Sequence, residues 1–154
     1  MQWDTTDTDG RYLFNEIPIG ATVQLSCKKS DSPLKGLTAF DLALIQQAIL
    51  GINPLTHDYQ YIAGDPDFNQ IILPQDVSLI RRLILEIDSQ FAHGLTWVFI
   101  PINFNSSQQL SLGKVDYTTT QNLQVEGINI NQDWMAVKLG DLNNSALSTS
   151  VNAQ

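Results

Sequence analysis

The stretch that decides the fold of this chain is Asp65-Pro66-Asp67-Phe68-Asn69-Gln70-Ile71-Ile72-Leu73-Pro74-Gln75-Asp76. Its first, third, fifth and twelfth positions are occupied by Asp65, Asp67, Asn69 and Asp76. Side-chain oxygens at this spacing, together with the carbonyl oxygen of the seventh residue, form the ligand set of a twelve-residue calcium loop. The stretch therefore predicts a calcium site made by Asp65, Asp67, Asn69, Ile71 and Asp76.

Two positions of this loop depart from the usual pattern. Gln70 stands at the sixth position, where the backbone needs a positive φ and a residue other than glycine costs about 1 kcal/mol. Asp76 stands where the longer glutamate is usual. Both departures predict a dissociation constant of about micromolar to millimolar, which suits the calcium-rich extracellular space. The alternative is a turn rich in Asp and Asn that only caps the following helix.

The loop belongs to an internal repeat. Residues 36–50 align with residues 71–85 at an offset of 35, so that Asp41 matches Asp76 and Ile45 matches Ile80. Apolar residues recur at helical spacing in both units and predict helices over 40–50 and 76–87, which we expect to pack on each other. Ile72, at the eighth loop position, is expected to face the core and to pair with the second loop. Two loop–helix units in tandem are the organisation of paired EF-hands.

Over about residues 36–87, these motifs resemble the dockerin family. The resemblance implies two calcium loops, each followed by one helix, and binding to a cohesin-like partner domain. It also implies that partner recognition uses positions late in each loop and along each helix. In this chain those positions are Ala39, Phe40, Gln46 and Gln47 in the first repeat, and Pro74, Gln75, Arg81 and Arg82 in the second.

The first loop of the repeat is incomplete in the sequence. Counting back from Asp41 places Ser30, Ser32 and Leu34 at the first, third and fifth positions, which is a poor ligand set. The opening half of such a loop occurs instead near the other end of the chain, at 140–145. We therefore predict a circularly permuted second site, with a ligand set of Asp141, Asn143, Ser145, Thr38 and Asp41. The alternatives are a terminal turn at 141–143 and a first loop served by Asp31 alone or by no ligand.

The flanks of the repeat read as β-structure. Residues 2–28, 97–100, 123–125 and 134–139 alternate or are rich in strand-forming residues. Residues 5–29 resemble the last strands of a Cna-B-like or carboxypeptidase-regulatory-like sandwich. Together with the 138–146 segment, they resemble parts of large secreted proteins of Bacteroidetes-type bacteria. This resemblance implies an extracellular or cell-surface location and a role in adhesion.

These patterns predict an α+β fold with a paired loop–helix calcium core and strands from both termini around it. The expected division is a β segment at 1–30, a dockerin-like domain at 31–146 and a tail at 147–154, in one compact unit. The formal charge of −8 over 154 residues excludes nucleic acid as a partner. No apolar run reaches the length of about 18 residues needed to span a bilayer, so no membrane insertion is expected.

Other residue classes point away from catalysis. No nucleophile–base pair, paired-carboxylate signature or glycine-rich phosphate loop is present, so we do not expect an enzyme. The three tryptophans, Trp3, Trp97 and Trp134, lie in or beside apolar runs and are expected in the core rather than on a sugar-binding platform. Cys27 is expected to be a small buried residue. The expected function is protein–protein interaction or attachment; the alternative is a calcium-rigidified spacer without a partner of its own.

Overall fold

The computed structural model describes residues 1–103, 110–127 and 130–148. Its helices are α1 (Ala39–Ile49), α2 (Asp58–Ala63), α3 (Pro74–Ile84) and α4 (Ser145–Ser148). Its strands are β1 (Thr22–Leu25), β2 (Trp97–Pro101), β3 (Leu110–Ser111), β4 (Lys114–Val115), β5 (Gln121–Gln124) and β6 (Trp134–Lys138). The predicted mixture of α and β structure is therefore confirmed. No helix in the described ranges is long and apolar enough to cross a membrane.

The two helices of the repeat begin in the same way. The carboxylate of Asp41 accepts a hydrogen bond from the backbone N–H of Thr38 (2.8 Å), and that of Asp76 accepts one from Leu73 (2.7 Å). Each aspartate thereby satisfies a donor that precedes the first turn and places a negative charge at the helix N-terminus. The last carboxylate of each predicted calcium loop is thus also the residue that starts its helix.

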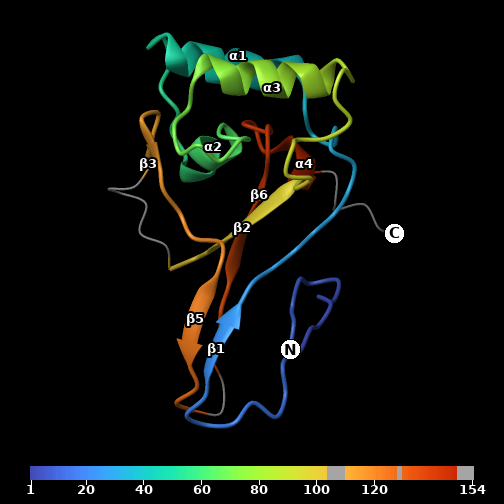
Figure 1. Cartoon of the computed structure of the whole chain (residues 1–154), viewed down its shortest axis with the longest axis vertical. Coiled ribbons are helices and arrows are strands. Elements are labelled where there is room, and N and C mark those ends of the chain that lie inside the picture. Colours follow the sequence, from blue (N-terminus) through green and yellow to red (C-terminus); the bar gives the residue numbers. More distant parts are fainter. Residues whose placement is uncertain (104–109, 128–129, 149–154) are drawn as a thin grey trace.

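The helices α1 and α3 lie side by side and cover one end of the molecule (Figure 1). Ile45 and Ala48 of α1 are buried, as are Val77, Ile80 and Leu83 of α3. Both predicted helices and their mutual packing are confirmed. The helix α2, which lies beneath them, was not predicted, because only six residues form it and this is too short to show a helical period.

The strands form three antiparallel ribbons of two strands each among the described residues: β1–β5, β2–β6 and β3–β4. The strands of β3–β4 are neighbours in the chain, whereas those of β1–β5 and β2–β6 are far apart in sequence. In β2–β6, Trp97 is opposite Lys138 and Pro101 is opposite Trp134. The strands β2 and β6 pass below the helices, whereas β1 and β5 extend away from them (Figure 1). The buried core therefore gathers on α1, α2, α3, β2 and β6 and on the segment after β6.

The prediction of β-structure throughout 2–28 is wrong except for β1. No residue before Leu37 is buried, and Trp3 has 82% of its surface exposed, so the expected core position of Trp3 is also wrong. A strand needs a neighbour to satisfy its backbone, and among the described residues the first 19 pair with no strand, whereas Gly20 and Ala21 bond to Val125 beside the β1–β5 ribbon. Cys27 is half-buried rather than buried.

The last described residues form a short helix. The tail was predicted to begin at residue 147, yet α4 spans Ser145–Ser148, and Ala146 has only 1% of its surface exposed. Most of the tail predicted at 147–154 lies outside the described residues. The proposed division of the chain at residues 30 and 146 stays a prediction.

Candidate metal centre

The Asp65–Asp76 loop connects α2 to α3. It begins directly after Gly64, at the C-terminal end of α2. Phe68 and Gln70 adopt positive φ values of 59° and 70°. The positive φ expected at Gln70 is therefore confirmed, and a second strained residue stands two positions before it. This folding turns the side chains of the loop back toward its own centre.

Three carboxylates meet there. Asp65, Asp67 and Asp76 each offer one ligand atom, and these atoms all lie within 4.8 Å of one another. Asp65 and Asp76 are fully buried, whereas Asp67 is half-buried. Negative charges held this close in a buried position repel one another unless a cation or protons compensate them.

Each of the two buried carboxylates has one oxygen in use and one free. Asp65 Oδ2 accepts a hydrogen bond from the backbone N–H of Gln70 (3.1 Å), and Asp76 Oδ2 accepts one from Leu73 (2.7 Å). Asp65 Oδ1 and Asp76 Oδ1 are buried and meet no donor in the described structure. A buried carboxylate oxygen without a partner is costly, and a bound cation removes that cost. The two free oxygens therefore fit a metal ion.

Burial and the closeness of these carboxylates also raise the pKa values of Asp65 and Asp76. Burial, and then the neighbouring Asp67 and Asp76, raise the pKa of Asp65 from 3.8 to about 7. Burial, together with the charge of Asp67, raises the pKa of Asp76 to about 6 against the lowering effect of the Leu73 N–H. A cation that binds here must displace protons from carboxylates that hold them unusually well.

The remaining predicted ligands lie at the exposed side of the loop. Asn69 Oδ1 accepts a hydrogen bond from the backbone N–H of Ile71 (2.9 Å), and Asn69 Nδ2 donates to Asp67 Oδ2 (3.0 Å). The Ile71 side chain is 41% exposed and points away from the core. The structure thus places Asn69 against Asp67, while the role of the Ile71 carbonyl stays a prediction.

The pairing predicted for Ile72 is wrong. Ile72 does face the core, with 3% of its surface exposed, but its N–H donates to the carbonyl of Leu112 (2.7 Å) and not to the second loop. Val115 likewise donates to the carbonyl of Gln70 (2.8 Å). The β3–β4 hairpin therefore takes the place that a second loop has in a simple EF-hand pair. Nothing in the short sequence of this hairpin indicated that role.

His93, which has no predicted role, contacts the loop at Pro66 and Phe68. His93 Nε2 lies 2.7 Å from the carbonyl oxygen of Pro66, and its ring stacks on Phe68 with centroids 4.3 Å apart. Phe68 is the residue with φ of 59°. These contacts hold the strained turn, and only the structure could show them because 25 residues separate the two rings.

The split second loop is assembled from the start of the first repeat and from a segment far beyond the second repeat. Asp41 Oδ1 accepts hydrogen bonds from the backbone N–H groups of Leu142 (2.8 Å) and Asn143 (3.1 Å), which lie about 100 residues away in the chain. Asp41 and Asp141 are both buried, with 0% and 2% of their surface exposed. The structure therefore places the 141–145 segment beside Thr38 and Asp41, the juxtaposition on which the permuted site depends.

The two halves repeat the hydrogen bonds of the continuous loop. Asp141 Oδ2 accepts from Ala146 N–H (2.8 Å), five residues on, as Asp65 does from Gln70. Asn143 Oδ1 accepts from Ser145 N–H (2.9 Å), two residues on, as Asp67 does from Asn69. Asn144 has φ of 60°, close to the 59° of its counterpart Phe68. The half-loop at 141–146 thus has the conformation of the first half of a calcium loop.

The halves meet where a continuous chain would join them. Ala146 corresponds to the sixth loop position and Gly36 to the seventh. Ser145 Oγ donates to the carbonyl of Gly36 (2.8 Å), although the two residues are 109 positions apart. A Cβ atom on Gly36 would lie 2.5 Å from the Cβ of Ala146, and Gly36 has φ of +83°. Only glycine permits this close approach at this backbone angle.

The split loop differs from the continuous loop in its free ligand atoms. It has two carboxylates instead of three, and all four of their oxygens accept hydrogen bonds: those of Asp41 from Thr38, Leu142 and Asn143, and those of Asp141 from Ser145 and Ala146. Burial raises the pKa of Asp141. Metal binding by Asp141, Asn143, Ser145, Thr38 and Asp41 stays a prediction.

Asp31 does not serve the first loop. Its Oδ1 accepts hydrogen bonds from Lys138 Nζ and from Trp97 Nε1, both at 2.8 Å. Burial raises the pKa of Asp31, but these two hydrogen bonds and the lysine charge outweigh it, so that the net shift is downward. Asp31 Oδ1 is engaged outside the split loop, and its buried Oδ2 accepts no hydrogen bond among the described residues, so no contact supports the alternative in which Asp31 alone supplies the first loop.

The predicted partner-binding residues lie on the two paired helices. Arg81 and Arg82 are exposed, and Arg82 forms a two-pronged ion pair with Asp88, with both N–O distances at 2.7 Å. Gln46 and Gln47 are half-buried, and Gln47 accepts a hydrogen bond from Asn53 (2.7 Å). The side chain of Phe40 is 59% exposed, which leaves it accessible on the surface.

No family model matches the sequence, and the searches of curated proteins and of solved structures return no match. The site is therefore interpreted from its own geometry.

Proposed function

We propose that this chain is an extracellular calcium-binding, dockerin-like module that mediates protein–protein interaction or attachment. The observation that carries the proposal is the pair of buried, unpartnered oxygens on Asp65 and Asp76, in a group of three carboxylates whose ligand atoms lie within 4.8 Å. A metal ion is the partner that such a group lacks. The ligand atoms that Asp65, Asp67 and Asp76 offer at this centre are carboxylate oxygens, which favours a hard cation over zinc or copper.

Calcium is favoured over magnesium by the way the ligands are supplied. Magnesium needs a nearly ideal octahedron, whereas calcium accepts about six to eight oxygens in a flexible arrangement. A loop that offers Asp65, Asp67 and Asp76, with Asn69 and the Ile71 carbonyl close by, can adapt to calcium with small side-chain rotations. We extend the proposal to a second, weaker calcium ion in the split loop at Asp141 and Asp41.

The surface of the paired helices favours an interaction with another protein. Leu50 and Ile52 follow α1, and Leu85 and Ile87 follow α3 at the equivalent repeat positions. All four are large apolar side chains with 60–71% of their surface exposed. Exposed apolar residues that recur with the repeat are typical of a docking surface. A cohesin-like domain is the partner that the dockerin resemblance implies.

A structural role is the second candidate function. The split loop joins segments from opposite ends of the folded core through Asp41, Leu142 and Asn143. An ion bound there would tie the two ends together and resist unfolding, because it binds only the folded state. This would make the chain a calcium-rigidified spacer that needs no partner.

Titration calorimetry of chelator-treated protein with calcium, followed by thermal melts with and without calcium, tests the proposed metal function. We expect calcium to bind and to raise the melting temperature. Absence of heat and of a shift at about 10 mM calcium, above the range of extracellular modules, would mean that the loop is only a turn.

Pull-down against cohesin-like domains then separates the two candidate functions. Binding that is lost in Leu50→Asp and Leu85→Asp, and retained in Asp88→Ala, supports interaction. A calcium-dependent rise in melting temperature without any cohesin binding supports the spacer.

A further inference from the structure

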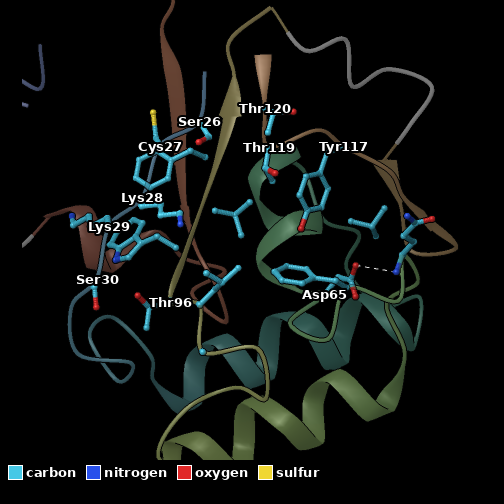
Figure 2. A pocket seen from close by; sticks show the side chains of 18 residues that line it. Ser26, Cys27, Lys28, Lys29, Ser30, Asp65, Thr96, Tyr117, Thr119 and Thr120 are labelled. Carbon is cyan, nitrogen blue, oxygen red and sulfur yellow. Dashed lines mark hydrogen bonds between the residues drawn. The ribbon is translucent and has the colours of Figure 1, made fainter. Parts of the chain in front are cut away.

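A deep groove lies next to the metal centre. It has a volume of about 830 Å³ and is lined by residues from three stretches, 26–30, 94–99 and 115–120, together with Asp65, Phe68 and Gln70. In Figure 2, Ser26 to Ser30 stand on one side of the groove and Tyr117, Thr119 and Thr120 on the other. This volume is within the range of binding sites, about 300–1,000 Å³.

The groove runs along an unpaired strand edge. Three consecutive residues of β2, 97–99, line it together with 94–96 just before the strand; because side chains of a strand alternate between faces, the groove follows the backbone of β2 there. Leu139 donates to the carbonyl of Thr96 (3.1 Å) and Ile102 donates to that of Asp133 (3.0 Å), so the even-numbered residues of β2 bond to β6. The N–H and C=O groups of Trp97 and Phe99 therefore point to the opposite edge.

These edge groups have no strand beside them. Within the described ranges, β2 pairs with β6 alone, and no further hydrogen bond is recorded for the backbone of Trp97 or Phe99. Trp97 has only 3% of its surface exposed, and buried backbone groups are almost always paired. Thr96 Oγ1, which also lines the groove, is buried without a partner. The wall thus offers several hydrogen-bonding groups that an extended segment could satisfy.

The charge around the groove is opposite to that of the molecule. Two lysines, Lys28 and Lys29, line the groove against one carboxylate, Asp65, in a chain whose net charge is −8. Two more, Lys35 and Lys138, lie nearby and are paired with Asp31. Lys29 Nζ lies 4.2 Å from the Trp97 ring centroid, and Lys35 Nζ and Lys138 Nζ lie 3.8 and 2.8 Å from Asp31. Lys28 and Lys29 are exposed and line the groove. A local excess of positive charge selects an anionic partner.

We propose that this groove binds an acidic, extended segment of a partner polypeptide, which adds as a strand to the free edge of β2. Main-chain hydrogen bonds to Trp97 and Phe99 hold the segment, as in other cases of strand addition. Lys28 and Lys29 pair with its carboxylates, and the aromatic side chains that line the groove receive its apolar residues. This site is separate from the α1–α3 surface and does not require the metal ion.

Fluorescence anisotropy with two labelled eight-residue peptides tests the proposal. One alternates glutamate and valine, and the other alternates lysine and valine; both are titrated with the full chain in about 5 mM calcium, within the range that saturates extracellular modules. We expect the acidic peptide to bind and the basic peptide to bind at least about tenfold more weakly, because opposite charges meet at the groove. The Lys28→Glu/Lys29→Glu variant should reverse that preference, whereas Arg11→Glu, an exposed charge outside the groove, should not.

A pair of variants at Phe99 tests the strand edge itself. Phe99→Ala and Phe99→Pro both remove the ring, but only proline removes the N–H, which points away from β6. We expect Phe99→Pro to bind the acidic peptide about fivefold more weakly than Phe99→Ala, the effect of one hydrogen bond, with similar melting temperatures. Failure of the acidic peptide to bind at about 1 mM, equal binding of both peptides, or a second copy of the chain seated in the groove in solution would overturn the proposal. Because Asp65, a proposed calcium ligand, lines the groove, the acidic peptide is also titrated in the presence of a chelator, where binding to Lys28 and Lys29 should persist even if the chain binds no calcium.

Discussion

The continuous loop at 65–76 and the split loop formed by 36–41 and 141–146 adopt similar conformations although only one of them is an unbroken segment. In 65–76 the first and last carboxylates are eleven residues apart, whereas in the split loop Asp41 and Asp141 are 100 positions apart in the chain. The hydrogen bonds of the first half are nevertheless the same: the N–H of Gln70 donates to Asp65, and the N–H of Ala146 donates to Asp141. The hydrogen bonds within each half therefore set its conformation. Contacts of Gly36 with Ser145 and Ala146 take the place of the peptide bond that joins the two halves of a continuous loop.

The loops differ in what they leave free for a cation. The continuous loop has three carboxylates and two buried oxygens without a partner, on Asp65 and Asp76. In the split loop, backbone N–H groups already reach every carboxylate oxygen of Asp41 and Asp141. A loop whose carboxylates are already bonded gains less from an ion. The continuous loop should therefore be the tighter site.

The largest expected effect is on calcium binding. Asp65→Ala removes a buried ligand of the continuous loop, so we expect the tighter calcium affinity to fall at least about tenfold, as judged by titration calorimetry. Asp141→Ala should leave the tighter site unchanged and abolish a weaker one. Asp88→Ala, which removes a surface carboxylate far from both loops in sequence, is the control. Equal losses in Asp65→Ala and Asp141→Ala would contradict the ranking of the two sites.

The second effect concerns the contact between Gly36 and Ala146, where the two halves of the split loop meet. In Gly36→Ala, the new Cβ would meet Ala146 at 2.5 Å at a φ of +83°. We expect this variant to lose about 3 kcal/mol of unfolding free energy in urea, from overpacking and backbone strain together.

A matched glycine separates those two causes. Gly51 has φ of +69° and open space around the position of a Cβ. Gly51→Ala should therefore cost only about 1 kcal/mol, from the backbone alone. Equal losses in the two variants would show that the approach of Ala146 to Gly36 contributes nothing to stability.

The comparison also shows which features the sequence could predict. The continuous loop and the helices α1 and α3 depend on local spacing, and local spacing is visible in a chain read from end to end. The split loop was predictable because both halves keep their own residues, Asp141 with Asn143 and Thr38 with Asp41. The hairpin that pairs with Ile72, and the support of Phe68 by His93, are contacts between distant segments with no sequence signal.

The wrong predictions have a physical reason in common. Strand-forming residues in 2–28 indicate a β tendency, but a strand exists only where a neighbouring strand pairs with it, and the sequence does not say which neighbour is present. Trp3 was expected in the core for its apolar surroundings, yet no core reaches it. The groove beside β2 was equally invisible, because an unpaired edge is a property of the assembled sheet.

A pH dependence should distinguish the split loop from the continuous one. Asp31 and Lys138 pair just before the two halves of the split loop, with Lys138 only 1% exposed. Asp31→Asn should cost about 2 kcal/mol at pH 7, because it leaves a buried lysine without its counter-charge. The pKa of Asp31 is lowered in the folded chain, since the hydrogen bonds from Lys138 and Trp97 outweigh burial.

The sign follows from that downward shift. A carboxylate with a depressed folded pKa contributes its stability fully above its unfolded value, about 3.9, and loses it as the pH falls through the folded value. The difference in unfolding free energy between the wild type and Asp31→Asn should therefore be constant above about pH 5 and shrink below pH 4. Calcium affinity of the continuous loop should be the same in both proteins at pH 7. A difference that stays constant down to pH 2 would contradict the ion pair.

The smallest effect lies at the sixth position, where the two loops differ in backbone. Gln70 has φ of +70°, whereas its counterpart Ala146 lies in α4, where φ is negative. Gln70→Gly should therefore stabilise the protein by about 0.5–1 kcal/mol, because glycine adopts this angle without strain. Ala146→Gly should destabilise it by about 1 kcal/mol, since a buried methyl group is lost and the unfolded chain gains freedom. Urea unfolding of both variants measures whether the two changes in unfolding free energy have opposite signs. If both changes stabilise the protein, the backbone of the sixth residue is strained in both loops. The two loops would then share a backbone conformation at this position as well as their hydrogen bonds.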